Sequence, residues 1–154
     1  MLHPPRKLMY ALEAVVDIAH NARPDPVQSK AVTRRQGIPH RYLEQVMQHL
    51  VHTGILKGVR GPKGGYTLAR ERRRITVGEV VRAIDQLSDD GDEDNDGEAA
   101  GASPIGRAVL GPFWNRLYAD FIRRLDEVTL EELCRQVQEA GINPESGDVT
   151  DFNI

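Results

Sequence analysis

The sequence predicts a mainly α-helical protein in which two helices joined by a glycine turn precede a two-stranded β-hairpin and, further on, a long helix. One observation is the helical spacing of apolar residues over 7–20 and 39–52. Another is the glycine-rich run 60–65 between two short segments of strand character. A third is an apolar and aromatic stripe at helical spacing over 104–127. Together these features predict a small helical domain with a hairpin, followed by a helical extension.

Length and composition limit the class of protein. The chain has 154 residues, which suits one domain with an appendage. The most apolar stretch near the start, 11–19, is interrupted by Glu13 and Asp17, so we expect neither a signal peptide nor a membrane helix. The single cysteine, Cys134, excludes an internal disulfide framework and an all-cysteine metal site within one chain. We therefore expect a soluble cytoplasmic protein.

Charge is divided unevenly along the chain. Residues 1–84 contain 15 Lys and Arg against 6 Asp and Glu, whereas residues 85–154 contain 5 against 17. A basic half joined to an acidic half favours a nucleic-acid-binding module with an appendage that has another role. Two solvated surfaces of opposite sign are the alternative explanation.

The first three helices follow from spacing and from helix-ending residues. A first helix is predicted over 7–20, and a turn that contains two prolines follows it. Ser29 is expected to cap a short helix that ends at Gly37. Pro39 is expected in the first turn of a third helix, which ends before Gly54.

The third helix has an apolar stripe and an opposite polar stripe. The apolar residues are Leu43, Val46, Met47 and Leu50. The polar residues are Arg41, Glu44, Gln45, Gln48 and His52. Such polar side chains can bond to base edges and phosphates, and a short helix, a glycine turn and a second helix form a helix-turn-helix. An amphipathic helix with an ordinary solvated face explains the same stripe.

The hairpin that follows makes DNA binding the stronger interpretation. Two short strands are expected over 55–59 and 66–69. Arg60 and Lys63 lie at the tip between them, where a structural hairpin does not need cations. A cation on a thin loop suits the narrow, electronegative minor groove of DNA. A phosphate-binding loop is rejected because no Gly-Lys-Ser/Thr is present.

The DNA-binding domain is predicted over residues 1–87. Four arginines after the hairpin either contact phosphates or form a solvated linker: Arg70, Arg72, Arg73 and Arg74. Thr76 and Glu79 form a capping box that opens a helix. Residues 88–102 carry seven acidic residues and no large apolar one, so a flexible acidic loop is expected. A partial match to a calcium loop begins at Asp92, but the closing glutamate is absent.

Residues 103–140 are predicted to form dimerisation helices. Ser103 and Pro104 begin a long helix that is kinked at Pro112. Its apolar stripe is expected to pack on a second copy of the chain, or alternatively on its own domain. The stripe comprises Leu110, Trp114, Leu117, Phe121, Leu125 and Val128. Thr129 caps a last helix, and residues 141–154 read as a flexible acidic tail.

Several motifs together resemble those of the Rrf-two-type winged helix-turn-helix regulators, a family with IscR-like, NsrR-like and CymR-like members. The resemblance covers about residues 5–87 closely and the dimerisation helix in layout only. The motifs are Tyr10-Ala11-Leu12, Gly37-Ile38, Arg41-Tyr42-Leu43-Glu44-Gln45, Val59-Arg60-Gly61-Pro62-Lys63-Gly64-Gly65-Tyr66 and Ile75-Thr76-Val77-Gly78-Glu79-Val80-Val81-Arg82-Ala83.

The resemblance implies a homodimer that binds an imperfect palindrome in double-stranded DNA and represses transcription. It implies that part of the third helix enters the major groove, that Arg60 enters the minor groove and that Lys7 contacts the backbone. The candidate DNA-binding residues are Lys7, Tyr10, Arg41, Tyr42, Glu44, Gln45, Gln48, Arg60 and Lys63. Pro39 departs from the family, where relatives often carry a hydroxyl residue that caps this helix.

The effector region also departs from the family. Cluster-binding members carry three cysteines before the dimerisation helix, and this chain has none there. It therefore resembles a member without the iron–sulfur cluster, and we expect no cofactor and no metal site. Cys134 is interpreted as a small core residue, although a redox or metal-sensing role for it is an alternative. Neither a catalytic arrangement nor a cofactor motif appears, so we expect no enzymatic activity.

The last four residues suggest a protein partner. Asp151, Phe152, Asn153 and Ile154 resemble the C-terminal tail with which serine acetyltransferases bind cysteine synthase (O-acetylserine sulfhydrylase). CymR-like members are controlled by that enzyme, so a regulator of cysteine or sulfur metabolism is the closest functional match. A chance ending in isoleucine is one alternative. Another is an interaction module that inhibits cysteine synthase without DNA specificity.

Overall fold

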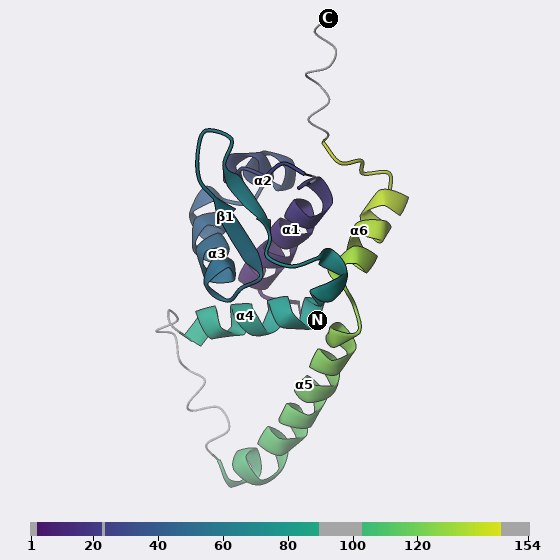
Figure 1. The fold of residues 1–154 in the computed structure, drawn as a ribbon. Helices are drawn as coiled ribbons and strands as arrows, with labels where there is room; N and C mark the ends of the chain where they lie inside the picture. The colour runs from purple at the N-terminus through teal and green to yellow at the C-terminus, as the bar shows by residue number, and fades with distance from the viewer. Residues whose placement is uncertain (1–2, 23, 90–102, 146–154) are drawn as a thin grey trace, which may run out of the picture.

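The computed structural model describes residues 3–22, 24–89 and 103–145. Its elements confirm a mainly α-helical chain with a two-stranded hairpin (Figure 1). They are, in order, α1 (Arg6–Asn21), α2 (Ser29–Gln36), α3 (His40–His52), β1 (Leu56–Val59), β2 (Gly65–Leu68), the 3₁₀ turn η1 (Arg72–Arg74), α4 (Val77–Asp89), the π-helical segment η2 (Gly106–Leu110), α5 (Gly111–Asp126) and α6 (Leu130–Glu139). The predicted acidic loop and the last nine residues lie outside the described residues, except that Ser88 and Asp89 belong to α4.

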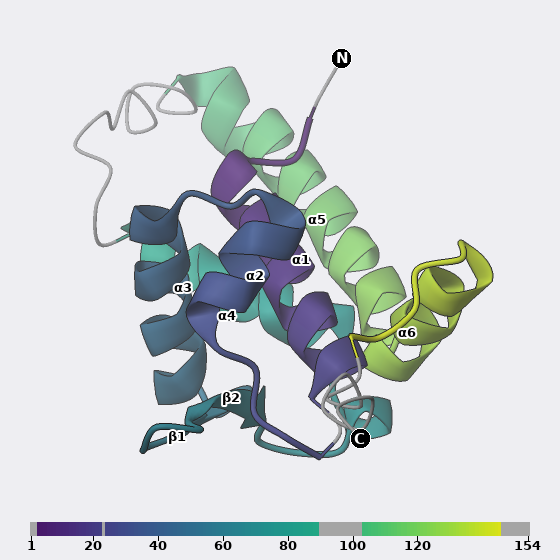
Figure 2. The same cartoon turned by 90° about the horizontal axis from the view of Figure 1, so that it is seen from above.

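The main core lies among α1, α2, α3, α4 and the hairpin. The side chains of Ala11, Val15 and Ile18 on α1 are fully buried, and they meet apolar side chains from each neighbouring element. Burial of an aliphatic side chain contributes about 1.5–3 kcal/mol, so this face of α1 is the main source of stability for the domain. In Figure 2, α1 runs through the middle of the helices.

The hairpin pairs antiparallel and is anchored to the start of α2. Leu56 pairs with Leu68 and Val59 pairs with Gly65. The outer edge of β2 exchanges two backbone hydrogen bonds between Val27 and Tyr66, of 2.8 and 2.9 Å. A Cβ atom on Gly65 would lie 2.4 Å from the carbonyl oxygen of Val27, so only glycine allows this approach.

Two helix starts and one kink differ from, or refine, the sequence expectations. Ser29 is the first residue of α2 and not its cap, since Gln28 occupies that position without a side-chain bond. Pro39 is likewise the N-cap of α3, one residue before the expected position. The predicted kink near Pro112 takes the form of η2, in which the Gly111 N–H donates to the Gly106 carbonyl. Proline lacks an N–H and its ring collides with the carbonyl four residues back, which explains the wider turn.

Helix α5 packs on α4 at its C-terminal end only. Arg82 forms a two-pronged ion pair with Asp126, with distances of 2.5 and 2.7 Å, and the Tyr118 hydroxyl donates to Asp85. A Cβ atom on Gly78 would collide with Asp126, so the absent side chain lets the two helices approach. Figure 1 shows the N-terminal part of α5 extending away from the other helices.

Helix α6, which lies within the segment predicted for dimerisation, contributes side chains to the main core. Leu130 and Cys134 are buried there, at 0 and 2 % exposure. The expected Thr129 cap is present, because its hydroxyl accepts the Glu132 N–H at 3.2 Å. The Leu130 N–H also donates to the Ile75 carbonyl at 2.9 Å, which joins the start of α6 to the end of η1.

The beginning of the predicted tail is attached to the domain. Glu145 accepts from Arg34 and from Arg35 at 2.7 Å each, and its N–H donates to the Asn21 side chain at 2.8 Å. The ring Nε2–H of His20 donates to the carbonyl of Ile142 at 2.9 Å. The expectation of a free tail from residue 141 is therefore wrong for residues 142–145, because these contacts bind them to α1 and α2.

Within the described ranges, no helix combines the length and the hydropathy needed to cross a bilayer.

Candidate DNA-binding surface

The turn between α2 and α3 orients α3 on the domain. Gly37 ends α2 in the left-handed conformation (φ 68°), which glycine adopts without strain. Ile38 is fully buried, so it fixes the turn to the core, and Pro39 starts α3 with a φ of −57°. A short helix, a tight turn and a longer helix in this order form the predicted helix-turn-helix.

The two stripes predicted on α3 separate as expected. Leu43, Val46, Met47 and Leu50 are all at most 2 % exposed. The polar side chains predicted to contact DNA are all exposed on the other side of α3. They are Arg41, Tyr42, Glu44, Gln45 and Gln48. Inside the domain, His49 bonds to the Ala83 carbonyl at 2.5 Å, which ties α3 to α4. A rigid helix therefore presents a polar face to solvent.

Contacts at the N-terminal end of α3 bring α1 into the same surface. The rings of Tyr10 and Tyr42 lie 6.0 Å apart between centroids, at an angle of 40°. Tyr10 is half-buried, and Lys7 lies one turn earlier on α1 and is half-buried as well. The structure thus places Tyr10 beside α3, which is the helix predicted to enter the major groove.

Glu44 lies within reach of a histidine on its own helix. The His40 Nε2 and a Glu44 carboxylate oxygen are 3.2 Å apart, and both side chains are about 60 % exposed. An exposed pair of this kind contributes little to stability, so Glu44 can leave it to accept a bond from another group. Sequence reasoning did not identify His40 as part of this surface, although its position four residues before Glu44 on one helix face was visible.

The wing, which consists of β1, β2 and the turn between them, presents two cations at its tip. A turn closed by the Gly64 N–H and the Gly61 carbonyl, at 2.9 Å, carries Arg60 and Lys63. Both side chains are exposed, and neither forms a hydrogen bond or an ion pair within the described part of the chain. A Cβ atom on Gly64 would lie 2.3 Å from the Val59 carbonyl oxygen, so the tip is narrow because glycine is required there.

Other basic residues are engaged inside the protein. Arg35 binds Asp17, and Arg70 binds Glu79 at 3.3 Å. Arg73 binds Glu71 at 2.5 Å, which lowers the pKa of that carboxyl. The predicted run of phosphate-contacting arginines is therefore at least partly paired internally, whereas Arg41 has no partner among the described residues. Arg41 on α3 and Arg60 and Lys63 on the hairpin are therefore among the exposed cations without an internal partner in the described ranges.

The described residues include no set of side chains that fits an iron–sulfur cluster or another metal centre. A cluster requires several thiolates, and Cys134 is the single cysteine of the sequence. Burial raises the pKa of its thiol, against an opposing effect of nearby Arg72, and its side chain lies in the main core. No group of three or more metal-ligating side chains occurs in the described ranges.

The apolar stripe predicted for dimerisation divides into two parts. Leu110, Trp114, Leu117 and Phe121 are 48–58 % exposed on α5. Leu125 and Val128 are half-buried within the chain, against a cluster of Val77, Val81 and Ile122. Four further large apolar side chains extend the exposed part: Ile105, Val109, Phe113 and Tyr118. An apolar surface this extensive is typical of a protein–protein contact.

The similarity of the chain to known protein families agrees with this geometry. A model for the Rrf2 family, described as an iron-dependent transcriptional regulator, matches residues 5–136. Among curated proteins, the HTH-type transcriptional regulator IscR of Cronobacter sakazakii is 34 % identical over 142 residues, which cover 92 % of this chain and 82 % of that protein.

Two solved structures are similar as well. IscR from T. potens has a TM-score of 0.71 and 31 % identity, over 90 % of each chain. CymR of B. subtilis, described as a global cysteine regulator, has a TM-score of 0.65 and 26 % identity, over 88 % of this chain and 98 % of that one. These relatives are transcriptional regulators and not enzymes.

Proposed function

The chain belongs to the Rrf2 family of DNA-binding transcriptional regulators, and from that premise we propose that it acts as a homodimer that represses transcription at an imperfect palindrome. The single observation that carries the proposal is the pairing of an exposed polar face on α3 with an unpaired cationic wing tip. Two copies related by a two-fold axis would place two such surfaces on successive turns of a duplex.

Each side chain on α3 has a distinct role in this proposal. The Arg41 guanidinium can donate two bonds to a guanine, the Gln45 amide can bond to an adenine, and Glu44 can accept from a cytosine amino group. Each such contact is worth about 1–3 kcal/mol of discrimination against a wrong base. Gln48 and Tyr42 extend the same face, and Lys7 and Tyr10 on α1 contact the backbone next to it.

The wing contributes affinity more than base reading. Arg60 enters the minor groove, where the narrow tip allows a close approach and where the negative potential favours a guanidinium. Lys63 neutralises a phosphate on the groove edge. The contact thus supports binding at sites whose minor groove is narrow.

An Arg60→Ala variant tests the proposed wing contact. Operator affinity should fall about ten-fold or more, because one unpaired cation and its groove contact are removed. Lys57→Ala, an exposed cation on β1 away from the tip, serves as the matched control. Fluorescence anisotropy in matched salt measures the affinities, and circular dichroism confirms folding. Equal affinity of Arg60→Ala and the unchanged protein would contradict the role of the wing.

We also propose that the target genes serve cysteine or sulfur metabolism and that the tail binds cysteine synthase. The similarity to a global cysteine regulator supports this proposal. So does the segment Asp151-Phe152-Asn153-Ile154, which resembles the segment with which serine acetyltransferases bind cysteine synthase. Removing Ile154 should abolish co-purification with cysteine synthase, whereas Asp148→Asn should not. A complex that survives loss of Ile154 would refute the tail interaction and leave DNA binding untouched.

A further inference from the structure

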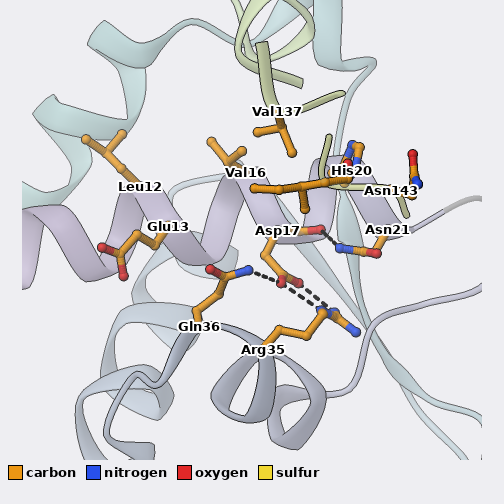
Figure 3. A pocket seen from close by; sticks show the side chains of 11 residues that line it. Leu12, Glu13, Val16, Asp17, His20, Asn21, Arg35, Gln36, Val137 and Asn143 are labelled. Carbon is orange, nitrogen blue, oxygen red and sulfur yellow. Dashed lines mark hydrogen bonds and ion pairs between the residues drawn. The ribbon is translucent and has the colours of Figure 1, made fainter. Parts of the chain in front are cut away.

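A cavity of about 310 Å³ opens between α1, the end of α2, the end of α6 and residues 142–143 (Figure 3). None of the predicted DNA-binding residues lines it. Its volume is at the lower end of the range of about 300–1,000 Å³ found for small-molecule sites. A compact ligand would therefore fill it.

One side of the cavity is apolar. In Figure 3, Leu12 and Val16 of α1 point toward α6, where Val137 lies. Ile142 continues this side, and its carbonyl accepts the His20 ring N–H at 2.9 Å. The contacts of Glu145 with α2 hold this part of the chain in place. An apolar group seated here would be removed from water on several sides.

The other side is polar, and most of its groups are already paired. The buried carboxylate of Asp17 accepts from Arg35 at 2.6 and 2.8 Å and from the Gln36 amide nitrogen at 2.8 Å. The remaining guanidinium nitrogen of Arg35 donates to Glu145. Three of the five N–H donors of Arg35 are thus engaged, and its single charge is matched by two carboxylates, so it offers little attraction to a further anion in the cavity.

Glu13 is the one charged side chain of the lining without a partner among the described residues, and the neutral amide of Asn143 is likewise unpaired. Its carboxylate points to the α2 side of α1, near Gln36, and lines the cavity (Figure 3). It forms no hydrogen bond or ion pair with any described residue. Because the amide nitrogen of Gln36 donates to Asp17, its carbonyl oxygen is left as a second acceptor. The cavity thus presents acceptors, and a net negative charge, next to an apolar wall.

We propose that this cavity binds a small molecule that carries a primary ammonium group on a compact apolar body. The ammonium would pair with Glu13 and donate to the Gln36 carbonyl, while the body contacts Val16 and Val137. Bonds of a charged donor to a partly buried carboxylate are stronger than bonds between neutral groups. A carboxylate ligand would instead meet Glu13 with the same charge, so the site discriminates by the sign of the head group. The proposal does not depend on DNA binding.

Three probes with the same ring test the proposal on the full chain. They are the amine cyclohexylmethylamine, the alcohol cyclohexylmethanol and the carboxylate anion of cyclohexylacetic acid. Calorimetric titration should show saturable binding of the amine with a Kd of about 1 mM or lower. The alcohol should bind about ten-fold more weakly, and the carboxylate should not bind. Equal affinity for the amine and the alcohol, or no saturation by the amine up to about 10 mM, would overturn the proposal.

Two variants locate the binding. Glu13→Gln should remove the ten-fold preference for the amine, whereas Asp25→Asn, an exposed acidic residue outside the cavity, should keep it. Val137→Phe, which fills the apolar side, should abolish binding of all three probes and keeps the test informative if Glu13→Gln does not fold. Amine binding unchanged in both cavity variants would place the ligand elsewhere and refute the proposal.

Discussion

At the scale of single residues, Asp17 shows how a charge inside this domain is tolerated. Its carboxylate is fully removed from solvent and receives three donors from α2, two from Arg35 and one from Gln36. A buried charge without such partners would cost several kcal/mol. In the sequence, Asp17 looks like an ordinary polar interruption of an apolar stretch, because the partners that make it acceptable lie 18 and 19 positions away.

An Asp17→Asn variant should lower the free energy of unfolding by about 3 kcal/mol, because Arg35 then loses its buried countercharge and keeps only the half-exposed Glu145. Urea denaturation measures the change. The matched control is Glu71→Gln, whose ion pair with Arg73 is about 60 % exposed on both sides and should give no measurable effect. Similar midpoints for the unchanged protein and Asp17→Asn would contradict the structural role of the buried pair.

Two glycines of the hairpin differ in whether a side chain would fit at their positions. A Cβ atom on Gly65 would meet the Val27 backbone, whereas a Cβ atom on Gly58 would meet nothing within 4 Å. Gly65→Ala should therefore destabilise the protein by about 1–3 kcal/mol, through displacement of the wing from Val27, and Gly58→Ala should not. Thermal unfolding compares the two. Equal melting temperatures would show that the Val27 contact does not constrain the hairpin.

At the scale of elements, helix α5 carries the apolar surface that we propose contacts a second copy of the chain. Its C-terminal end packs on α4, but its N-terminal part exposes Trp114 and Phe121 at 58 and 53 %. Large apolar side chains such as these are removed from water at the interface of a stable dimer. The helix therefore has one end fixed within the chain and the other available to a partner.

Trp114→Glu should convert the dimer to a monomer at micromolar concentration, because a charge is then placed in the centre of an apolar interface. Arg116→Glu, an exposed residue on the other side of α5, should leave the dimer intact. Sedimentation velocity measures both. A dimer that persists in Trp114→Glu would show that the two copies meet elsewhere.

The elements also show how far the sequence predicts the structure. Helical spacing, Gly37, Gly54 and the run 60–65 locate α1 to α3 and the wing to within one or two residues, because these signals are local. Local signals predicted Cys134 as a core residue, but they did not reveal that α6 also contributes Leu130 to the main core or that Leu125 packs on α4, since both depend on contacts between distant segments. The cavity beside Glu13 also forms between segments that are distant in the sequence, so no local motif predicts it.

At the scale of the whole molecule, charge is distributed by function. The basic part of the sequence forms α3 and the wing, where Arg41, Arg60 and Lys63 have no internal partner within the described ranges. Elsewhere, several basic side chains are matched with acidic ones, among them Arg82 with Asp126 and Arg34 with Glu145. The surface proposed to face DNA therefore includes three unpaired cations, and others, such as Lys30 and Arg116, lie elsewhere on the described part of the chain. The sequence predicted that its first half is basic and its second half acidic. Only the ion pairs in the structure show which cations have no internal partner.

The most direct test is the affinity of the intact dimer for DNA fragments upstream of its own operon, measured at several salt concentrations. We expect nanomolar binding to one protected palindromic site, with an affinity that falls by a factor of about 10³ or more between 50 and 200 mM salt as phosphates lose their protein contacts. Gln45→Ala should weaken the specific site selectively and leave non-specific binding unchanged. Affinity that is the same for every sequence, or that does not change with salt, would contradict the assignment of α3 and the wing to DNA.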